Sequence, residues 1–127
     1  MRHKNIKSLD TNHLISKYKE AALAHGTASY SGDYRIANRE YENLIAIIRE
    51  IIGRGHSAED AFLALLSDEN AFVKIWAATH ALAFAPTQGE KALSEASQLP
   101  GLAGSTATLT LQEYREGRLQ VTLPISD

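Results

Sequence analysis

The sequence predicts an all-α fold of about six helices, packed as antiparallel pairs. Apolar residues recur at three- and four-residue steps over most of the chain, and residues that can cap a helix precede these segments. The connecting segments are only a few residues long and are rich in glycine, proline and serine. With 127 residues, of which 44% are hydrophobic and 22% charged, the chain can bury one core. We therefore expect residues 1–127 to form a single helical domain.

The first two helices are predicted over residues 11–29 and 34–52. Asp10 and Asp33 stand where a side-chain oxygen can accept the free amides of the first turn of each helix. The second helix is the more strongly amphipathic of the two. Its expected apolar stripe contains Tyr34, Ala37, Tyr41, Leu44, Ile45, Ile48, Ile51 and Ile52.

Four further helices are predicted over residues 58–66, 69–84, 87–98 and 103–116. Ser57 and Asp60 form the expected capping box of the helix over 58–66, and Thr87 and Glu90 form that of the helix over 87–98. Asp68 is the expected cap of the helix over 69–84. The helix over 69–84 is apolar around nearly its whole circumference, which is typical of a helix buried on more than one side. We expect its face of Trp76, His80 and Phe84 to belong to the structural core.

Both ends of the chain are expected to differ from the helical core. Residues 1–9 are basic and are predicted to be frayed. Residues 118–127 are predicted to form a short extended tail, because apolar and polar or proline residues alternate there. A strand-like segment of this kind would have one apolar edge that must be covered by the chain's own helices or by another chain.

Short stacked helix pairs are characteristic of helical repeat proteins. Residues 57–84 resemble a HEAT repeat, with paired leucines followed by Asp68, Val73 and small alanines. Residues 21–119 also resemble a small bacterial family of HEAT-like domains of unknown function, DUF2019. The resemblance rests on Ala21–Gly26 with Asp33, Asn38 and Tyr41, on Leu65–Asp68 with Val73 and Trp76–Leu82, and on Thr110, Leu111, Tyr114 and Gly117. It implies a right-handed α-α superhelix, a short α-solenoid, and it supplies no catalytic residue.

The sequence contains no recognisable catalytic or metal-binding motif. It has no cysteine, and no two of its five histidines are spaced to bind one metal from a helix face. We therefore expect no enzyme activity, no metal and no cofactor. His80 has two interpretations, a hydrogen-bonded core histidine, which is favoured, and a base that faces a ligand.

Charge and hydropathy narrow the possible partners and the location. The net charge of −2, without a concentrated basic segment beyond the first residues, makes nucleic acid an unlikely partner. No apolar run reaches the roughly 20 residues of a membrane helix, and the start lacks the apolar core of an export signal. A cytoplasmic protein is expected.

These observations favour a noncatalytic protein-interaction module of a bacterial cytosolic protein. The charged face of the second helix, with Arg35, Arg39, Glu42 and Arg49, is the candidate binding surface, although such a face can also be merely solvated. A narrower alternative is an immunity protein that neutralises a toxin domain. An alternative from another class is a nucleic-acid-binding HEAT-like protein. The protein is expected to be a monomer or a homodimer.

Overall fold

The computed structural model describes residues 3–119, and within them it confirms the all-α fold. Six α-helices and two 3-10 helices follow one another, and residues 3–119 contain no strand. The chain divides into two compact units, Met1–Phe62 and Leu63–Asp127.

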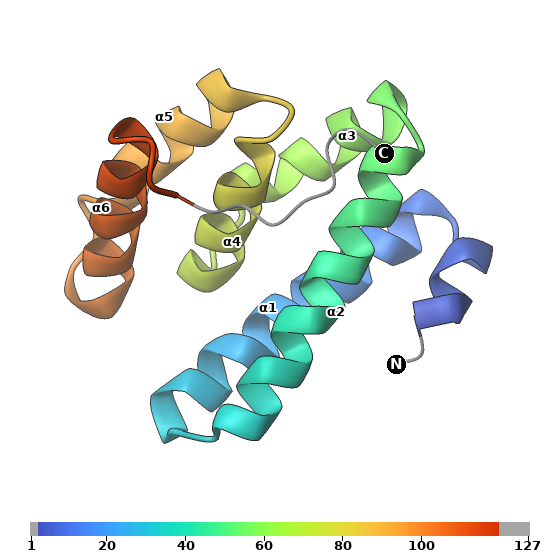
Figure 1. Ribbon diagram of the computed structural model, residues 1–127, viewed down its shortest axis with the longest axis horizontal. Coiled ribbons are helices and arrows are strands. Elements are labelled where there is room, and N and C mark those ends of the chain that lie inside the picture. Colours follow the sequence, from blue (N-terminus) through green and yellow to red (C-terminus); the bar gives the residue numbers. More distant parts are fainter. Residues whose placement is uncertain (1–2, 120–127) are drawn as a thin grey trace. The chain divides into compact units, whose positions relative to one another are not determined.

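The first unit contains a 3-10 helix, η1 (His3–Ser8), and the helices α1 (Thr11–Ser31), α2 (Tyr34–Gly53) and α3 (His56–Phe62). The long helices α1 and α2 lie side by side as an antiparallel hairpin (Figure 1). The bounds of both helices agree with the predicted ranges to within two residues.

Both predicted caps of the hairpin are confirmed. The Asp10 carboxylate accepts a hydrogen bond from the backbone N–H of His13 at 2.8 Å, and Asp33 accepts one from Ile36 at 3.2 Å. Gly32 ends α1 with φ +77°, a left-handed conformation that suits glycine. The backbone N–H of Asp33 then donates to the carbonyl of Ala28 at 2.9 Å, which closes the turn.

The core of the first unit is built from the facing sides of these helices. Tyr18 of α1 and Phe62 of α3 are fully buried and pack edge to face, with ring centroids 4.8 Å apart. Burial also raises the pKa of the Tyr18 hydroxyl well above its usual value of 10.0, because the phenolate would lose its hydration. The other large, fully buried side chains of this unit are Leu14, Leu44, Ile47, Ile48 and Ile51.

Part of the N-terminal segment that was predicted to be frayed forms the 3-10 helix η1. Ile6 is buried within the first unit, with 2% of its surface exposed. Arg54, just after α2, donates to the carbonyl oxygens of Ile6 at 3.2 Å and Lys7 at 3.5 Å. The same guanidinium also contacts Thr11 Oγ1 at 3.4 Å and the Glu50 carboxylate at 2.9 Å. One side chain thus joins η1, α1 and α2.

We expect Arg54→Ala to lower the free energy of unfolding by about 2 kcal/mol, because it removes several charge-assisted hydrogen bonds at once. Arg54→Lys should restore less than half of this loss, because an ammonium cannot reach these acceptors in the same fork. Urea unfolding measures both effects. Arg35→Ala is the matched control, since Arg35 is exposed and makes no ion pair within residues 3–119. Equal losses in the two alanine variants would contradict the role of Arg54.

The second unit contains the 3-10 helix η2 (Leu63–Ser67) and the helices α4 (Ala71–Ala81), α5 (Pro86–Ala96) and α6 (Gly101–Arg115). Helix α5 packs against both α4 and α6. The core of the second unit consists of Ile75, Ala78, Leu82, Ala92, Leu93, Ala96, Ala107 and Leu111. The face of α4 away from this core is buried too, because Val73, Ala77 and Ala81 have no exposed surface. The predicted burial of α4 on more than one side is therefore confirmed.

Three predicted caps are wrong. Asn70, not Asp68, caps α4, because its side-chain oxygen accepts from the amides of Phe72 and Val73. Asp68 instead accepts from the amide of Asn70 at 2.8 Å and shapes the turn before the helix.

The other two wrong caps lie at α3 and α5. Helix α5 begins at Pro86, whose fixed φ suits the first helical position, so Thr87 falls inside the helix and makes no cap. Helix α3 begins at His56, so Ser57 is also inside, and the predicted helix over 58–66 changes to the tighter η2 at Leu63.

The end of α6 agrees with its prediction. Gly117 has φ +74°, and the amide of Arg118 donates to the carbonyl of Glu113 at 2.8 Å, as in a glycine-terminated helix. Leu119 then packs against the core of the second unit. Residues 120–127, which carry most of the predicted extended tail, lie outside the described residues.

Candidate protein-binding surface

The four predicted binding residues lie on one exposed side of α2. Arg35, Arg39, Glu42 and Arg49 follow each other at steps of four, three and seven residues, which keeps them within one stripe of a helix. All four are exposed, because the opposite side of α2 carries the buried isoleucines and leucine that pack against α1. The amphipathic pattern of α2 therefore determines which way these side chains face.

The charge on this stripe is mostly positive. Arg39 lies 3.9 Å from the neighbouring Glu40, but Glu40 also accepts a hydrogen bond from Asn43 at 3.1 Å. Glu50, at the other end of the helix, is paired with Arg54. Glu42 is the only predicted member of the surface with a negative charge, beside three arginines. The stripe is therefore more positive than the chain as a whole.

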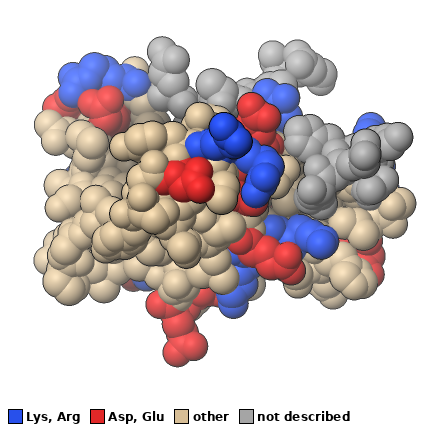
Figure 2. Space-filling model, turned by 90° about the horizontal axis from the view of Figure 1, so that it is seen from below, with Lys and Arg blue, Asp and Glu red and all other residues tan. Residues whose placement is uncertain are grey.

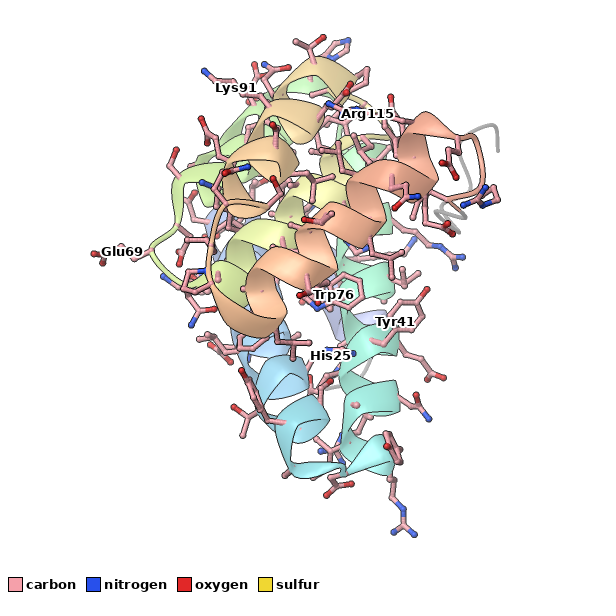
Figure 3. The ribbon with its side chains drawn as sticks, turned by 90° about the vertical axis from the view of Figure 1, so that its left-hand side faces the viewer. His25, Tyr41, Glu69, Trp76, Lys91 and Arg115 are labelled. Atoms are coloured by element: carbon pink, nitrogen blue, oxygen red, sulfur yellow. The ribbon has the colours of Figure 1, made fainter. Side chains whose placement is uncertain are left out.

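The α1–α2 hairpin also exposes three tyrosines, which the sequence-based prediction did not include in the binding surface. Tyr34 keeps 74% of its surface exposed, Tyr30 keeps 69% and Tyr41 keeps 36%. Tyr34 and Tyr41 belong to the predicted apolar stripe by helical spacing, but the hairpin does not cover them. Tyr34 is the first residue of α2, next to the turn of the hairpin, and Tyr41 projects from the same helix (Figure 3). Tyrosine and arginine together are the residue types enriched in protein-binding hot spots.

A second polar group lies between α1 and α2. His25 of α1 lies beside α2 (Figure 3), and its Nδ1 is 3.4 Å from Ser29 Oγ. Burial lowers the pKa of His25, although the negative charge of Glu40 opposes this shift. Asn43, with 8% of its surface exposed, is fixed by its hydrogen bond to Glu40. The influence of Glu40 on His25 depends on tertiary structure, because the two residues belong to different helices, so sequence spacing gives no signal for it.

The predicted core residues of α4 are not equally buried. His80 has only 2% of its surface exposed, and burial lowers its pKa from 6.5 to about 4, so the imidazole is neutral at pH 7. Trp76, whose ring centroid lies 5.5 Å from that of His80, is only partly buried. Phe84 is also partly buried, because α4 ends at Ala81 and leaves Phe84 in a turn. Of the three predicted core residues, His80 is therefore buried, whereas Trp76, a large side chain of a type that is seldom fully enclosed, and Phe84 are partly buried.

Other kinds of site find little support in the part of the chain that the structure describes. No group of three or more acidic residues or histidines within it is arranged to bind a metal ion. None of its helices is long and apolar enough to cross a membrane. Acidic and basic side chains are interspersed on the face shown in Figure 2, and neither sign forms a continuous patch there.

Comparison with known proteins supports the fold. No protein-family model matches the chain, and no curated protein matches it either. The crystal structure of the protein RPA1889 from Rhodopseudomonas palustris CGA009 is similar, with a TM-score of 0.80 and 21% sequence identity. The likeness covers 92% of this chain and 98% of that one. At this identity it shows a shared all-helical fold and nothing of function.

Proposed function

We propose that the protein is a noncatalytic, cytosolic protein-interaction module of a bacterium, and that it binds its partner through the exposed side of α2. The observation that carries this proposal is the group of exposed arginines and tyrosines around Tyr34, Arg35 and Arg39. These side chains offer both large contact area and charge-assisted hydrogen bonds. They project from a long helix that is held in a well-packed hairpin, so binding should cost little backbone conformational entropy.

The buried histidine also fits this proposal better than it fits catalysis. A general base must come within hydrogen-bond distance of its substrate, and His80 is almost completely shielded from solvent. His25, the other histidine whose pKa burial lowers, lies within the α1–α2 hairpin, where Glu40 opposes that shift. A HEAT-like superhelix, as the sequence resemblance implies, would serve the same binding role.

The proposal is tested by affinity purification from the native host, followed by reconstitution with the purified partner. We expect Arg35→Glu combined with Arg39→Glu to weaken the reconstituted complex at least 10-fold, because the reversed charges would face the same partner groups. Tyr34→Ala should weaken it by a similar factor. Lys91→Glu on α5 is the matched control, since Lys91 is also exposed and should change the affinity less than 2-fold. A partner that binds all variants equally would show that α2 is not the binding surface.

Single-stranded nucleic acid is a second candidate, because exposed tyrosines beside arginines can stack on bases and contact phosphates. The interspersed acids make it the weaker candidate. Fluorescence anisotropy with a labelled oligonucleotide distinguishes the two functions. Binding that falls steeply with salt and is lost in the Arg35→Glu, Arg39→Glu variant would favour nucleic acid, whereas no binding at about 10 µM protein would exclude it as a physiological ligand.

A further inference from the structure

Helix α2 carries two exposed arginines that no carboxylate within residues 3–119 holds at hydrogen-bond distance. Arg35 makes no ion pair with the described part of the chain. Arg39 lies 3.9 Å from a carboxylate oxygen of Glu40, which is longer than a hydrogen bond. The two arginines are four residues apart on one helix, so their Cβ atoms lie about 6 Å apart. We call Arg35 and Arg39 the arginine pair.

The arginine pair differs from other arginines of the chain, which are held by acidic side chains. Three arginines lie 2.8–2.9 Å from a carboxylate oxygen, in the pairs Arg54 with Glu50, Arg115 with Glu90, and Arg118 with Glu113. Glu42, three residues after Arg39, is spaced to pair with it, but the two make no ion pair. Two like charges one helical turn apart also repel each other. An ionic role in stabilising the fold therefore does not explain the arginine pair.

We propose that the arginine pair binds an acidic protein segment that carries two carboxylates one helical turn apart. This inference rests on the proposed function and specifies the chemistry of its partner. A guanidinium can donate two parallel hydrogen bonds to one carboxylate, so each arginine of the pair can hold one Asp or Glu of the partner. Acidic residues three or four positions apart on a partner helix have the same spacing as the arginine pair.

Two tyrosines lie beside the arginine pair and can shield its contacts from water. Tyr34, directly before Arg35, keeps 74% of its surface exposed, and Tyr41, two residues after Arg39, keeps 36%. The tyrosines are seven residues apart, so they lie on one flank of α2. A partner that covers these rings would lower the local dielectric constant around the arginine pair. Each arginine–carboxylate contact would then be stronger than one formed in open solvent.

Glu42 favours a protein segment over a continuous polyanion as the partner. It is exposed and lies one turn after Arg39 on the same stripe, so the charges along the stripe are positive, positive and negative. A nucleic acid or an anionic membrane presents negative charge without interruption, and Glu42 would repel it. A protein segment can instead place a neutral or basic residue opposite Glu42. That arrangement would also determine the direction in which the segment binds along α2.

NMR titration of the full chain with the peptide hexaglutamate tests this chemistry before the partner is known. At low ionic strength we expect shifts of the arginine-pair Nε–H signals and of the amides of residues 34–42, with a Kd of about 1 mM. Arg35→Gln combined with Arg39→Gln should abolish these shifts, whereas Arg115→Gln, which changes an arginine already paired with Glu90, should not. The proposal would be overturned by no shifts at about 5 mM hexaglutamate, or by tighter binding of a hexathymidylate oligonucleotide.

Carbodiimide crosslinking of the reconstituted complex tests whether carboxylates of the partner meet the arginine pair. The reagent joins an amine to a carboxylate in direct contact, and residues 34–53 contain no lysine. Arg35→Lys combined with Arg39→Lys keeps the charge, and we expect it to give a new crosslink to an Asp or Glu of the partner. Ser16→Lys, an exposed position on α1, is the matched control and should give none.

Charge exchange at the crosslinked position completes the test. Replacing that acidic residue of the partner by arginine should restore at least 10-fold of the affinity that Arg39→Glu removes. A complex that is weakened by Arg35→Glu and Arg39→Glu, but gives neither the crosslink nor the restored affinity, would overturn the acidic partner and leave α2 as the binding surface. A complex that these two charge reversals leave unchanged would contradict the proposed function itself, and this inference with it.

Discussion

Gly104→Ala should lower the free energy of unfolding by about 3 kcal/mol, at the upper end of the cost of overpacking. A methyl group at this position would overlap the carbonyl oxygen of Leu99 and would lie 2.9 Å from the Leu99 carbonyl carbon and 3.3 Å from the Ser97 oxygen. These are backbone atoms, so no side-chain rotation can relieve the overlap. The turn between α5 and α6 must move, and the contacts of both helices with the core of the second unit would be disturbed. Thermal or urea unfolding measures the loss.

Two other glycines provide the comparison. Gly89→Ala should also be destabilising, because its methyl would lie 2.8 Å from the Ala78 carbonyl oxygen where α5 crosses α4. Gly53→Ala, at the end of α2, meets nothing within 4 Å and should be neutral or stabilising by up to about 1 kcal/mol, through helix propensity. If Gly104→Ala were as stable as Gly53→Ala, the close packing between Leu99 and α6 would be contradicted.

Acidification should destabilise the protein through His80 by about 3 kcal/mol in total. The pKa of its buried imidazole is about 4 in the folded protein, whereas a histidine in the unfolded chain titrates near 6.5. Between these two pH values the unfolded chain binds more protons than the folded one. The free energy of unfolding is therefore unaffected by His80 above pH 6.5 and falls progressively as the pH decreases from 6.5 to 4, by about 1.4 kcal/mol per pH unit.

His80→Gln removes this titration while keeping a polar side chain, so its stability should depend less on pH between 6.5 and 4 than that of the wild type. His25 contributes in the same direction, because its pKa is also lowered by burial, but it is less buried than His80 and its contribution should be smaller. Urea unfolding at intervals across this pH range measures both. Parallel pH profiles for the wild type and His80→Gln would contradict a neutral buried imidazole.

The sequence predicted the hairpin of α1 and α2 well for a local reason. Asp10 and Asp33 each cap the helix that follows them directly, and the apolar residues of α2 repeat at helical spacing over five turns. The cap of α4 was mispredicted because the side chains of Asp68 and Asn70 can both accept hydrogen bonds from backbone amides there. Which of them caps the helix depends on the turn that the chain takes out of η2, and this turn is set by tertiary packing.

The candidate site was predicted in part. The arginines were placed correctly on the exposed side, because charged residues opposite an apolar stripe face solvent. The exposure of Tyr34 was not predicted, because helical periodicity does not show that the packing partner of α2 ends at the hairpin turn. The electrostatic influence of Glu40 on His25 acts between two helices, and the close approach at Gly104 depends on the path of the turn before α6, so one sequence contains no direct signal for either.

Hydrogen exchange on the reconstituted complex shows whether the exposed side of α2 binds a partner protein. Amides in the interior of a helix already exchange slowly in the free protein, so a partner can slow their exchange little further. The informative amides are those of the exposed hairpin turn and of the first turns of α2. We expect binding to slow exchange in residues 30–42, and the Arg35→Glu, Arg39→Glu variant to show no such change. Protection confined to α5 and α6, with residues 30–42 unaffected, would contradict the account.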